Sequence, residues 1–261
     1  PGVHNALVTI MLAFFDIGDT IAVDEFTYGN LIDAARFARV RLLPIPGDEE
    51  GMLPEALKKC CSREKIKGVF LMPTCANPTT ATMSSQRKDA IASIIGRYNI
   101  LVLEDDSTLV PDGSGTFFER LPDQTFHLTG STRFLASGLR VSFVLSPAKL
   151  FDKLVNALHR LTIKASAFDA EILSELILSG RAEKLLTKKI NRAKVMNGIF
   201  SKTFPDEKRN FNDPAFFRTI TIPTMHRNGP EIERELLHSG VRICHSYRFA
   251  ARKNPRKAFL R

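Results

Sequence analysis

The sequence lacks any run of about 18 apolar residues and any charged-then-apolar amino-terminal leader. We therefore expect no membrane span, no secretory signal and a cytoplasmic location. The chain has only four cysteines, Cys60, Cys61, Cys75 and Cys244, without a C-x-x-C spacing, and an adjacent pair rarely forms a disulfide. This pattern excludes a disulfide framework or a cysteine-based zinc site, so we predict reduced thiols and no bound metal.

The 261-residue chain has an ordinary composition, with 44% hydrophobic and 25% charged residues. That length suits one large domain and a smaller one. The formal net charge of +9 would favour nucleic acid or anionic small molecules, but the basic residues are spread along the chain. The densest basic stretch, residues 184–194, recurs at helical spacing. We interpret it as a solvated helix face, and a phosphate-rich partner is the alternative.

Short apolar, β-branched runs alternate with helical patterns in the first half of the chain. Strands are predicted at residues 20–23, 40–45, 68–72, 100–103 and 125–128. Helices between them include residues 30–39 and 84–98. Such alternation is typical of crossover units, which build a mainly parallel sheet with helices on both faces. The predicted fold class is α/β, with ligands at the carboxyl ends of the strands.

From residue 147 to about residue 204 the pattern becomes almost wholly helical, and short strands are predicted again at 216–222. We therefore predict a large domain over residues 1–185 and a smaller α+β domain over residues 186–261, joined by a helix. The chain starts abruptly and stops inside a strand pattern. We expect the large domain to be incomplete at its amino end, and the small domain to be truncated, with strand partners missing at its end.

Polar side chains gather where predicted strands end or helices begin. Gly2-Val3-His4 opens a helical pattern, and free backbone N–H groups at a helix start bind phosphate well. Tyr28 and Asn77-Pro78 follow the first and third predicted strands. Glu104-Asp105-Asp106 follows the fourth, so its carboxylates are expected to face the crevice at the carboxyl edge of the sheet. The plain structural alternatives are a helix cap, a half-buried tyrosine, a common turn and solvated loop acids.

One further segment runs Ser131-Thr132-Arg133-Phe134-Leu135-Ala136-Ser137-Gly138-Leu139-Arg140. It resembles the Ser-Lys-x-Leu-Ala-x-Gly-Leu-Arg signature of fold-type I pyridoxal-phosphate (PLP) aminotransferases of class I/II. The segments named above match motifs of the same family, in the same order. Residues 171–189, with their Ser-Gly-Arg turn, look most like the aminotransferase-like domain of MocR-type GntR transcriptional regulators. The resemblance implies PLP-dependent transferase fold type I and PLP as the cofactor.

The resemblance assigns four residues to the phosphate end of the cofactor site. Val3 and His4 fall in the turn that holds the phosphate. Arg140 matches the arginine that pairs with the same phosphate through charge-assisted hydrogen bonds. Thr132 is a further cofactor-binding residue of this segment.

The resemblance places three residues around the pyridine ring. Tyr28 matches the aromatic residue that stacks on the ring, a type of contact worth about 0.5–1.5 kcal/mol beyond burial. Asn77 matches the asparagine that hydrogen-bonds the phenolic oxygen. Asp105 matches the carboxylate that keeps the ring nitrogen protonated and so makes the ring an electron sink.

The resemblance also implies partners. Arg261, in Phe259-Leu260-Arg261, is similar to the arginine that clamps the α-carboxylate of an amino acid or 2-oxo acid, and fork geometry suits it to that role. The family works as a homodimer, with each site built from both subunits. MocR-type regulators read DNA through an amino-terminal winged helix, which is absent from this chain.

Arg133 stands where the family has the lysine that forms the Schiff base with PLP and shuttles the substrate's α proton. A guanidinium stays protonated and does neither job. Thr80, Thr108 and Ser142 replace a glycine, a tyrosine and a glycine of the family pattern. Lys202 lies in a Ser-Lys-Thr sequence that mimics the missing motif, but we reject it because it lies far past the matched segment in a helical pattern.

Three functions remain open. The first is a transaminase acting on an amino acid and a 2-oxo acid, impaired because loss of a general base costs about 10²–10⁴ in rate. The second is a non-catalytic effector-sensing and dimerisation domain of a MocR/GntR-type regulator. It would hold PLP without a covalent bond, with Arg133 as a second phosphate or carboxylate clamp. The third is a decayed fragment.

Overall fold

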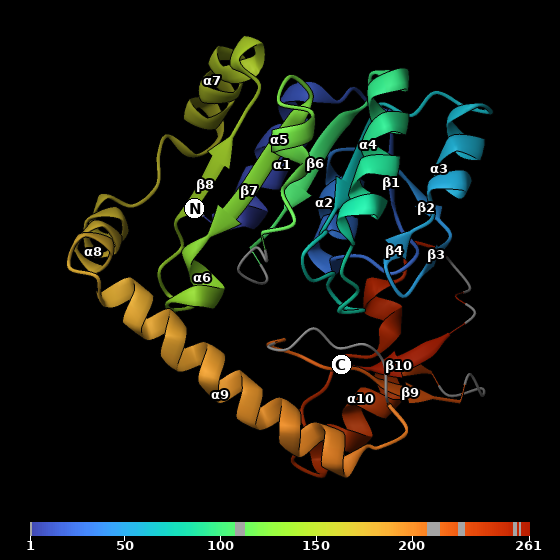
Figure 1. Cartoon of the computed structure of the whole chain (residues 1–261), viewed down its shortest axis with the longest axis vertical. Helices are drawn as coiled ribbons and strands as arrows, with labels where there is room; N and C mark the ends of the chain where they lie inside the picture. The colour runs from blue at the N-terminus through green and yellow to red at the C-terminus, as the bar shows by residue number, and fades with distance from the viewer. Residues whose placement is uncertain (1, 108–112, 208–214, 224–227, 253–254, 256) are drawn as a thin grey trace.

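The computed structural model describes residues 2–107, 113–207, 215–223, 228–252, 255 and 257–261 (Figure 1). Its centre is a six-stranded sheet in the order β2-β1-β5-β6-β7-β8. The parallel strands are β1 (Thr20–Asp24), β2 (Arg41–Ile45), β5 (Gly68–Leu71), β6 (Leu101–Asp105) and β7 (Thr125–Gly130). These confirm the five predicted strands to within two residues.

Helices cover both faces of the sheet, as the alternating pattern predicts. One face packs against α1 (Gly2–Phe14), α2 (Gly29–Phe37) and α7 (Phe151–Thr162). The other packs against α3 (Pro54–Cys61), α4 (Ser85–Tyr98) and α5 (Phe117–Arg120). Successive strand residues serve opposite faces, so Ile21 joins the first core and Ala22 the second. No helix in the described ranges combines the length and hydropathy needed to cross a bilayer.

Strand β8 (Ser142–Leu145) is antiparallel to β7 and was not predicted from the sequence. It forms the edge of the sheet, where Phe143 and Leu145 are about half exposed. The short segment α6 (Ser131–Phe134) and the loop after it connect β7 to β8. A small hairpin of β3 (Gly47–Asp48) and β4 (Gly51–Met52) also lies outside the prediction.

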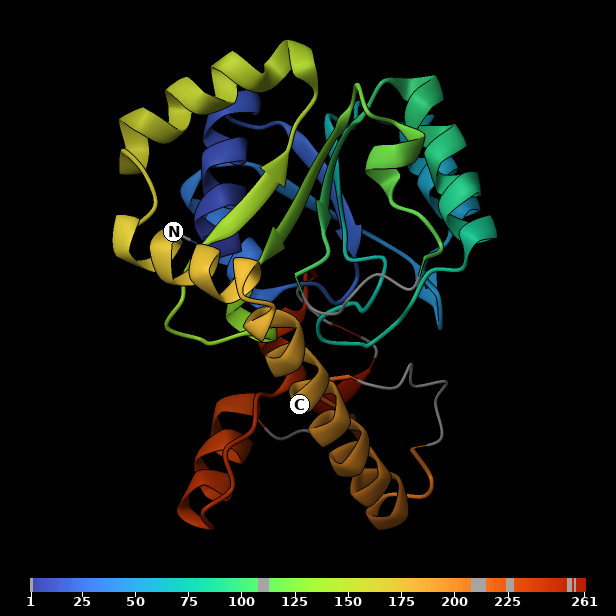
Figure 2. The same cartoon turned by 60° about the vertical axis from the view of Figure 1, so that its left-hand side comes forward.

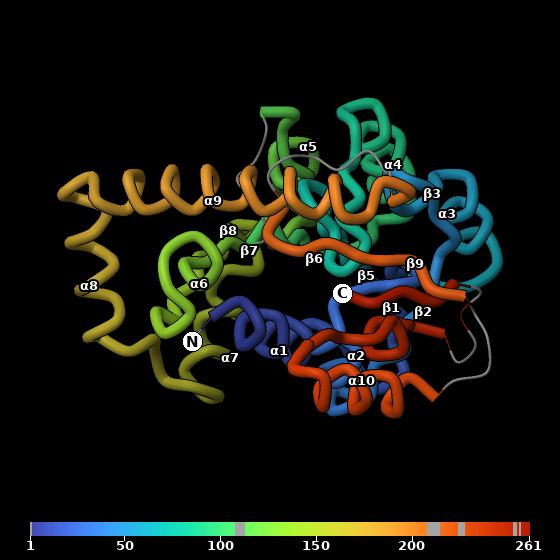
Figure 3. Tube along the Cα trace, turned by 90° about the horizontal axis from the view of Figure 1, so that it is seen from below, coloured from blue at the N-terminus to red at the C-terminus, as the bar shows by residue number. Residues whose placement is uncertain are grey.

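The second half of the described chain begins with η1 (Ala148–Leu150), α7 and α8 (Ala167–Leu178) and continues into the long helix α9 (Arg181–Thr203). Figures 2 and 3 show α9 running from the end of α8 along the lower side of the molecule towards the carboxyl-terminal unit. The predicted boundary at residue 185 falls within α9. The division into two domains stays a prediction, and a helix does connect the two regions.

The carboxyl-terminal unit contains β9 (Ile220–Ile222), α10 (Gly229–His238), η2 (Ser246–Phe249) and β10 (Ala258–Leu260). The expectation that the last strand lacks a partner is wrong, because β10 pairs antiparallel with β9. The predicted strand segment 216–222 is regular only over its last three residues. A bridge between Phe26 and Ala250 ties this unit to the segment after β1.

The topology decides where a ligand site forms. The chain places β2 on one side of β1 and then crosses to β5 on the other side, so a switch point lies between β1 and β5. Loops at the carboxyl ends of such strands diverge and leave a crevice. Tyr28, Asn77 and Thr132 follow β1, β5 and β7, and Asp105 ends β6. The fold therefore brings four predicted site residues to one edge.

Candidate functional site

A cavity of about 810 Å³ lies at this edge, and residues of α9 form part of its wall. Eight of the nine predicted site residues line it. They are Val3, His4, Tyr28, Asn77, Asp105, Thr132, Arg133 and Arg140. The ninth, Arg261, does not line the cavity. The structure thus brings together residues spread over more than half of the chain, while their chemical roles stay predictions.

The amino end of α1 and Arg140 form one end of the cavity. Gly2 has φ +78°, and a Cβ atom built on it would lie 3.3 Å from Nη2 of Arg140. The positive φ favours glycine here, and the guanidinium of Arg140 packs closely against it. Free N–H groups at a helix start and a guanidinium together attract an anion. Burial, followed by the charge of Arg140, lowers the pKa of His4.

Ser131, the first residue after β7, fixes the loop between β7 and β8 by two hydrogen bonds. Oγ of Ser131 donates to the carbonyl oxygens of Leu139 at 2.6 Å and Val141 at 3.1 Å. Just before it, a Cβ atom on Gly130 would lie 3.0 Å from Cγ2 of Val3. These contacts hold the loop that carries Arg140 beside the start of α1.

Asp105, Tyr28 and Asn77 form the inner part of the cavity. Asp105 is buried, and its Oδ1 accepts a 2.9 Å hydrogen bond from the backbone N–H of Ser107. Burial raises the pKa of Asp105, although the Ser107 hydrogen bonds and the charge of Arg133 oppose the change. Burial and the nearby Asp105 raise the pKa of Tyr28. Oδ1 of Asn77 is buried and has no hydrogen-bond partner within the described ranges.

Arg133 extends from α6 with its guanidinium carbon 5.5 Å from the centre of the Phe217 ring. Within the described part of the chain it forms no ion pair with a carboxylate. Its charge still acts on both Asp105 and Tyr28. Arg133 therefore presents a cation that rests on an aromatic face, at the position where the family resemblance predicts a reactive amine.

Arg261 lies beside the cavity rather than in its wall. Its guanidinium carbon is 4.3 Å from the centre of the Phe217 ring and 5.4 Å from that of Phe249. Burial, followed by the like charge of Arg133, lowers the pKa of Arg261. Its Nε atom is buried without a partner among the residues described. Phe217 thus contacts the two arginines, a feature that sequence reasoning missed.

Helix α9 contributes a wall of the cavity that was also missed. Lys189, Arg192, Ala193, Met196, Asn197 and Phe200 recur at helical spacing on the face that lines the cavity. Nζ of Lys189 donates to the backbone oxygen of Arg133 at 3.1 Å. The interpretation of residues 184–194 as a wholly solvated face is wrong at Lys189, which is half-buried. The run of basic residues at 184–194 was the sequence signal that could have pointed to this wall of the cavity. By contrast, Lys202 is exposed and lies outside the cavity wall.

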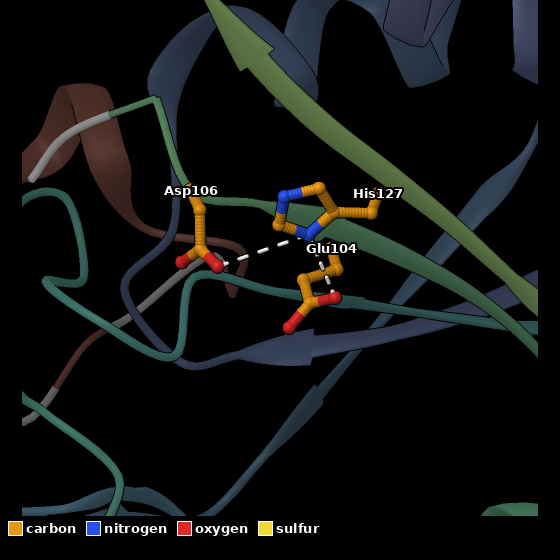
Figure 4. A group of neighbouring side chains, drawn as sticks. All are labelled: Glu104, Asp106 and His127. Carbon is orange, nitrogen blue, oxygen red and sulfur yellow. Dashed lines mark hydrogen bonds and ion pairs between the residues drawn. The ribbon is translucent and has the colours of Figure 1, made fainter. Parts of the chain in front are cut away.

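The expectation that Glu104, Asp105 and Asp106 all face the crevice is wrong, because successive strand residues alternate. Only Asp105 lines the cavity, and Glu104 and Asp106 instead gather around His127 of β7 (Figure 4). Nδ1 of His127 lies 2.9 Å from Oε2 of Glu104 and 3.8 Å from Oδ2 of Asp106. This buried cluster lies beside the cavity-lining carboxylate.

Glu104 of this cluster is already used by the fold. Its carboxylate accepts the backbone N–H groups of Phe117 at 2.7 Å and Phe118 at 3.1 Å, at the start of α5. The ligating atoms of Glu104, Asp106 and His127 lie within 4.8 Å of one another. We interpret the cluster as a link between β6, β7 and α5, since its hydrogen bonds satisfy Glu104 without a metal ion.

One half-buried and one buried carboxyl, Asp24 and Asp106, make stability depend on pH. Burial raises the pKa of Asp24 to about 7 and that of Asp106 to about 6. An unfolded aspartate titrates near pH ~3.9. The folded state therefore binds more protons from about pH 4 to pH 7, and stability is lost as the pH rises through the folded pKa values.

We expect the free energy of unfolding to be about 1–3 kcal/mol lower at pH 8 than at pH 5.5 from these two groups. Urea denaturation followed by circular dichroism at the two pH values measures it. Asp24→Asn does not titrate, so it should reduce the pH difference by about 1–2 kcal/mol. An unchanged difference in Asp24→Asn would show that Asp24 titrates normally in the folded chain.

Three residues, Thr80, Thr108 and Ser142, replace a glycine or a tyrosine of the family pattern. Two of them lie within the described residues. Thr80 has φ +60°, a conformation that glycine adopts without strain and a β-branched residue does not. Its backbone N–H and hydroxyl both bond neighbouring carbonyl oxygens, which hold the turn. Ser142 begins β8 opposite Gly130. Thr108 lies outside the described residues.

A model of the family described as aminotransferase class I and II matches residues 1–194, well over half of the chain. The chain belongs to this family. The resemblance read from the motifs is thereby confirmed. The matched span includes every predicted site residue except Arg261, which lies beyond it.

Relatives of the family domain fall into two groups. The uncharacterized HTH-type transcriptional regulator YdeF of Bacillus subtilis (strain 168) is 29% identical over 250 residues, covering 95% of this chain and 54% of YdeF. An aromatic amino acid aminotransferase of Dictyostelium discoideum is 28% identical over 207 residues, covering 72% of this chain and 41% of that protein. The chain thus spans about half the length of the curated relatives it matches, and the predicted likeness to MocR-type regulators is confirmed.

Solved structures show the same fold. The α-aminoadipate aminotransferase LysN of Thermus thermophilus, complexed with N-(5'-phosphopyridoxyl)-L-leucine, superposes with a TM-score of 0.85 at 21% identity. An archaeal alanine:glyoxylate aminotransferase gives 0.88 at 20% identity. Both matches cover 99% of this chain, and they cover 69% and 68% of the two structures. The predicted PLP-dependent transferase fold type I is confirmed.

PLP is the cofactor of this family, and the cavity fits most of it. Arg140 lines the cavity and packs against Gly2, so its guanidinium lies at the start of α1, where a phosphate would be held. The buried Asp105 carboxylate and the unpartnered Oδ1 of Asn77 mark polar positions for the ring. What does not fit is a covalent bond at residue 133, because Arg133 offers no amine.

Proposed function

We propose that this domain binds PLP through phosphate and ring contacts, does not transaminate, and serves as the ligand-sensing and dimerisation domain of a longer MocR-type regulator. One observation carries the proposal. Arg140, which packs against Gly2, and the buried Asp105 line the same cavity as Arg133, so the binding positions persist where the reactive position is changed. The likeness to YdeF along 95% of the chain supports the regulator context.

Transamination requires a base that moves a proton between two positions of the bound substrate. Bound PLP supplies an electron sink for that step. Asp105 would hold the proton on the ring nitrogen, and Arg140 with the start of α1 would hold the phosphate. Arg133 cannot accept a proton near neutral pH, so it orients an anion instead of moving a proton.

The ligand class we propose is an amino acid or 2-oxo acid. Its carboxylate would pair with Arg261, whose half-buried guanidinium has a buried Nε without a partner among the described residues. Arg133 would be the second anion clamp, because it lies on the same Phe217 ring. We further propose a cytoplasmic homodimer that contacts DNA only through a segment outside this chain.

The test compares PLP with pyridoxal, which lacks the phosphate. The chain has no tryptophan, so absorbance difference spectra after gel filtration measure retention better than intrinsic fluorescence. We expect saturable, one-to-one binding of PLP and binding of pyridoxal weaker by about tenfold or more, because charged hydrogen bonds to the phosphate are lost. Addition of amino acids should produce no amino form of the cofactor.

Two results would count against this function. Catalytic conversion of added amino acid would make the chain a transaminase. Absence of PLP binding, in a chain whose circular dichroism and melting transition show a folded protein, would leave the decayed-fragment interpretation. An HTH segment encoded upstream of residue 1 would add direct support for the regulator context.

A further inference from the structure

One amine lies inside the cavity. Among the described residues that line it, Lys189 is the single lysine. It extends from the middle of α9 and is half-buried, whereas Lys188 beside it and Lys202 further along α9 are exposed. The chain therefore directs one primary amine of this helix into the space that Asp105 and Arg140 also line.

The amine lies close to the position that lacks one. Nζ of Lys189 is 3.1 Å from the backbone oxygen of Arg133, so a lysine from another element reaches the residue where the amine is missing. This is the one hydrogen bond or ion pair of Nζ among the described residues, and the four-carbon stem of Lys189 is flexible. Arg192, three residues along the same face, adds a second cation to the wall.

We propose that Lys189 captures the aldehyde of PLP, or of a similar phosphate-bearing aldehyde, as an imine. The neutral Nζ attacks the aldehyde carbon, the aldehyde oxygen leaves as water with the two amine hydrogens, and a carbon–nitrogen double bond forms. No electrons are gained or lost. The proposal rests on the phosphate and ring contacts of the proposed function, which bring the aldehyde into the cavity, and it adds an attachment point on α9.

This attachment differs from one at residue 133 in what it connects. Residue 133 belongs to the sheet region through α6, whereas Lys189 belongs to the helix that continues into the carboxyl-terminal unit. A bound aldehyde would therefore link α9 to Asp105 and Arg140 of the sheet region. Ligand amines that compete for the aldehyde would release that link, which is a chemically direct way to sense an amino acid.

The experiment is borohydride trapping with peptide mapping by mass spectrometry on the full chain. The chain is mixed with one equivalent of PLP, reduced, digested and sequenced by fragmentation, which separates Lys189 from Lys188. We expect the reduced adduct at Lys189 to exceed that at any other lysine by at least about tenfold, since anchoring makes the reaction intramolecular. Pyridoxal should lose this preference.

Lys189→Arg is the decisive variant, because it keeps the charge and a donor for the Arg133 carbonyl but forms no imine. It should remove the dominant adduct, while Lys202→Arg, the same change on the exposed part of α9, should leave it unchanged. An adduct spread over surface lysines and unaffected by Lys189→Arg would overturn the proposal. Unreduced, saturable PLP binding in that same experiment would leave the proposed function standing, whereas loss of both would reject the two together.

Discussion

Arg133→Lys is expected to turn the domain from a holder of PLP into one that attaches it at residue 133 and exchanges amino groups. The amine would stand at the position where a base acts on the substrate's α carbon in the family. A positioned general base contributes about 10²–10⁴ in rate. We therefore expect the single-turnover conversion with an amino acid to rise by about that factor over the unaltered chain.

The physical reason lies in the two cations themselves. Arginine stays protonated and delocalised, so it neither forms an imine nor accepts a proton, whereas lysine does both once it loses its proton. Asp105 and Arg140 already line the cavity, and a hydrogen bond from Ser131 already holds the loop that carries residue 133. A change at residue 133 alone is therefore expected to alter the reaction and leave the residues that bind PLP unchanged.

The amine of Lys189 must be removed so that attachment of PLP at residue 133 can be measured alone. The double variant Arg133→Lys with Lys189→Arg isolates attachment at residue 133, and peptide mapping after borohydride locates it. Arg133→Gln is the control, because it removes the same cation without supplying an amine. If Arg133→Lys binds PLP but shows no gain in single-turnover rate, then Thr80, Thr108 and Ser142 have also disabled the reaction.

Arg140→Gln is expected to weaken PLP binding by about 10- to 150-fold. Hydrogen bonds to charged groups contribute about 1.5–3 kcal/mol, and a guanidinium can pair with a phosphate through two of them. The close contact between Arg140 and Gly2 places this cation at the start of α1, where the helix end adds to the attraction. Absorbance titration of the folded variant gives the dissociation constant.

The matched control is Arg160→Gln, which removes the same charge from an exposed position on α7. It should leave PLP affinity unchanged within about twofold, because an exposed charge far from the site is screened by salt. Pyridoxal supplies the second control, since its affinity should not depend on Arg140. Equal loss of pyridoxal binding would mean that Arg140→Gln damages the cavity as a whole.

The sheet could be predicted because its strands are short, apolar and separated by helical patterns. Strand β7 was found in this way, since Thr125–Gly130 carries several β-branched or aromatic residues. Strand β8 was not, because its apolar Phe143 and Leu145 are the half-exposed residues, so hydrophobicity along this edge strand does not follow burial. Hydrophobic period signals burial, and an edge strand is buried on too little of its surface to show it.

Some residues of the site could likewise be placed from the sequence, and others could not. Residues that follow strands in parallel, such as Tyr28, Asn77 and Asp105, could be placed at one edge from the sequence, since parallel strands share their carboxyl side. The alternation of strand residues could have separated Glu104 and Asp106 from Asp105, but their meeting with His127 depends on the register of β6 beside β7. In that register Glu104 and Asp106 lie beside His127, whereas Asp105 lines the cavity.

What the sequence by itself determined is the α/β class, the order of the motifs and the presence of an arginine at residue 133. These are local properties, set by residue type and by the period of burial along the chain. Only the tertiary structure decided that α9 walls the cavity, that Phe217 contacts both Arg133 and Arg261, and that Lys189 reaches the carbonyl of Arg133. Such contacts join segments far apart in the chain, 56 residues in the case of Lys189 and Arg133, and packing rather than local pattern selects them.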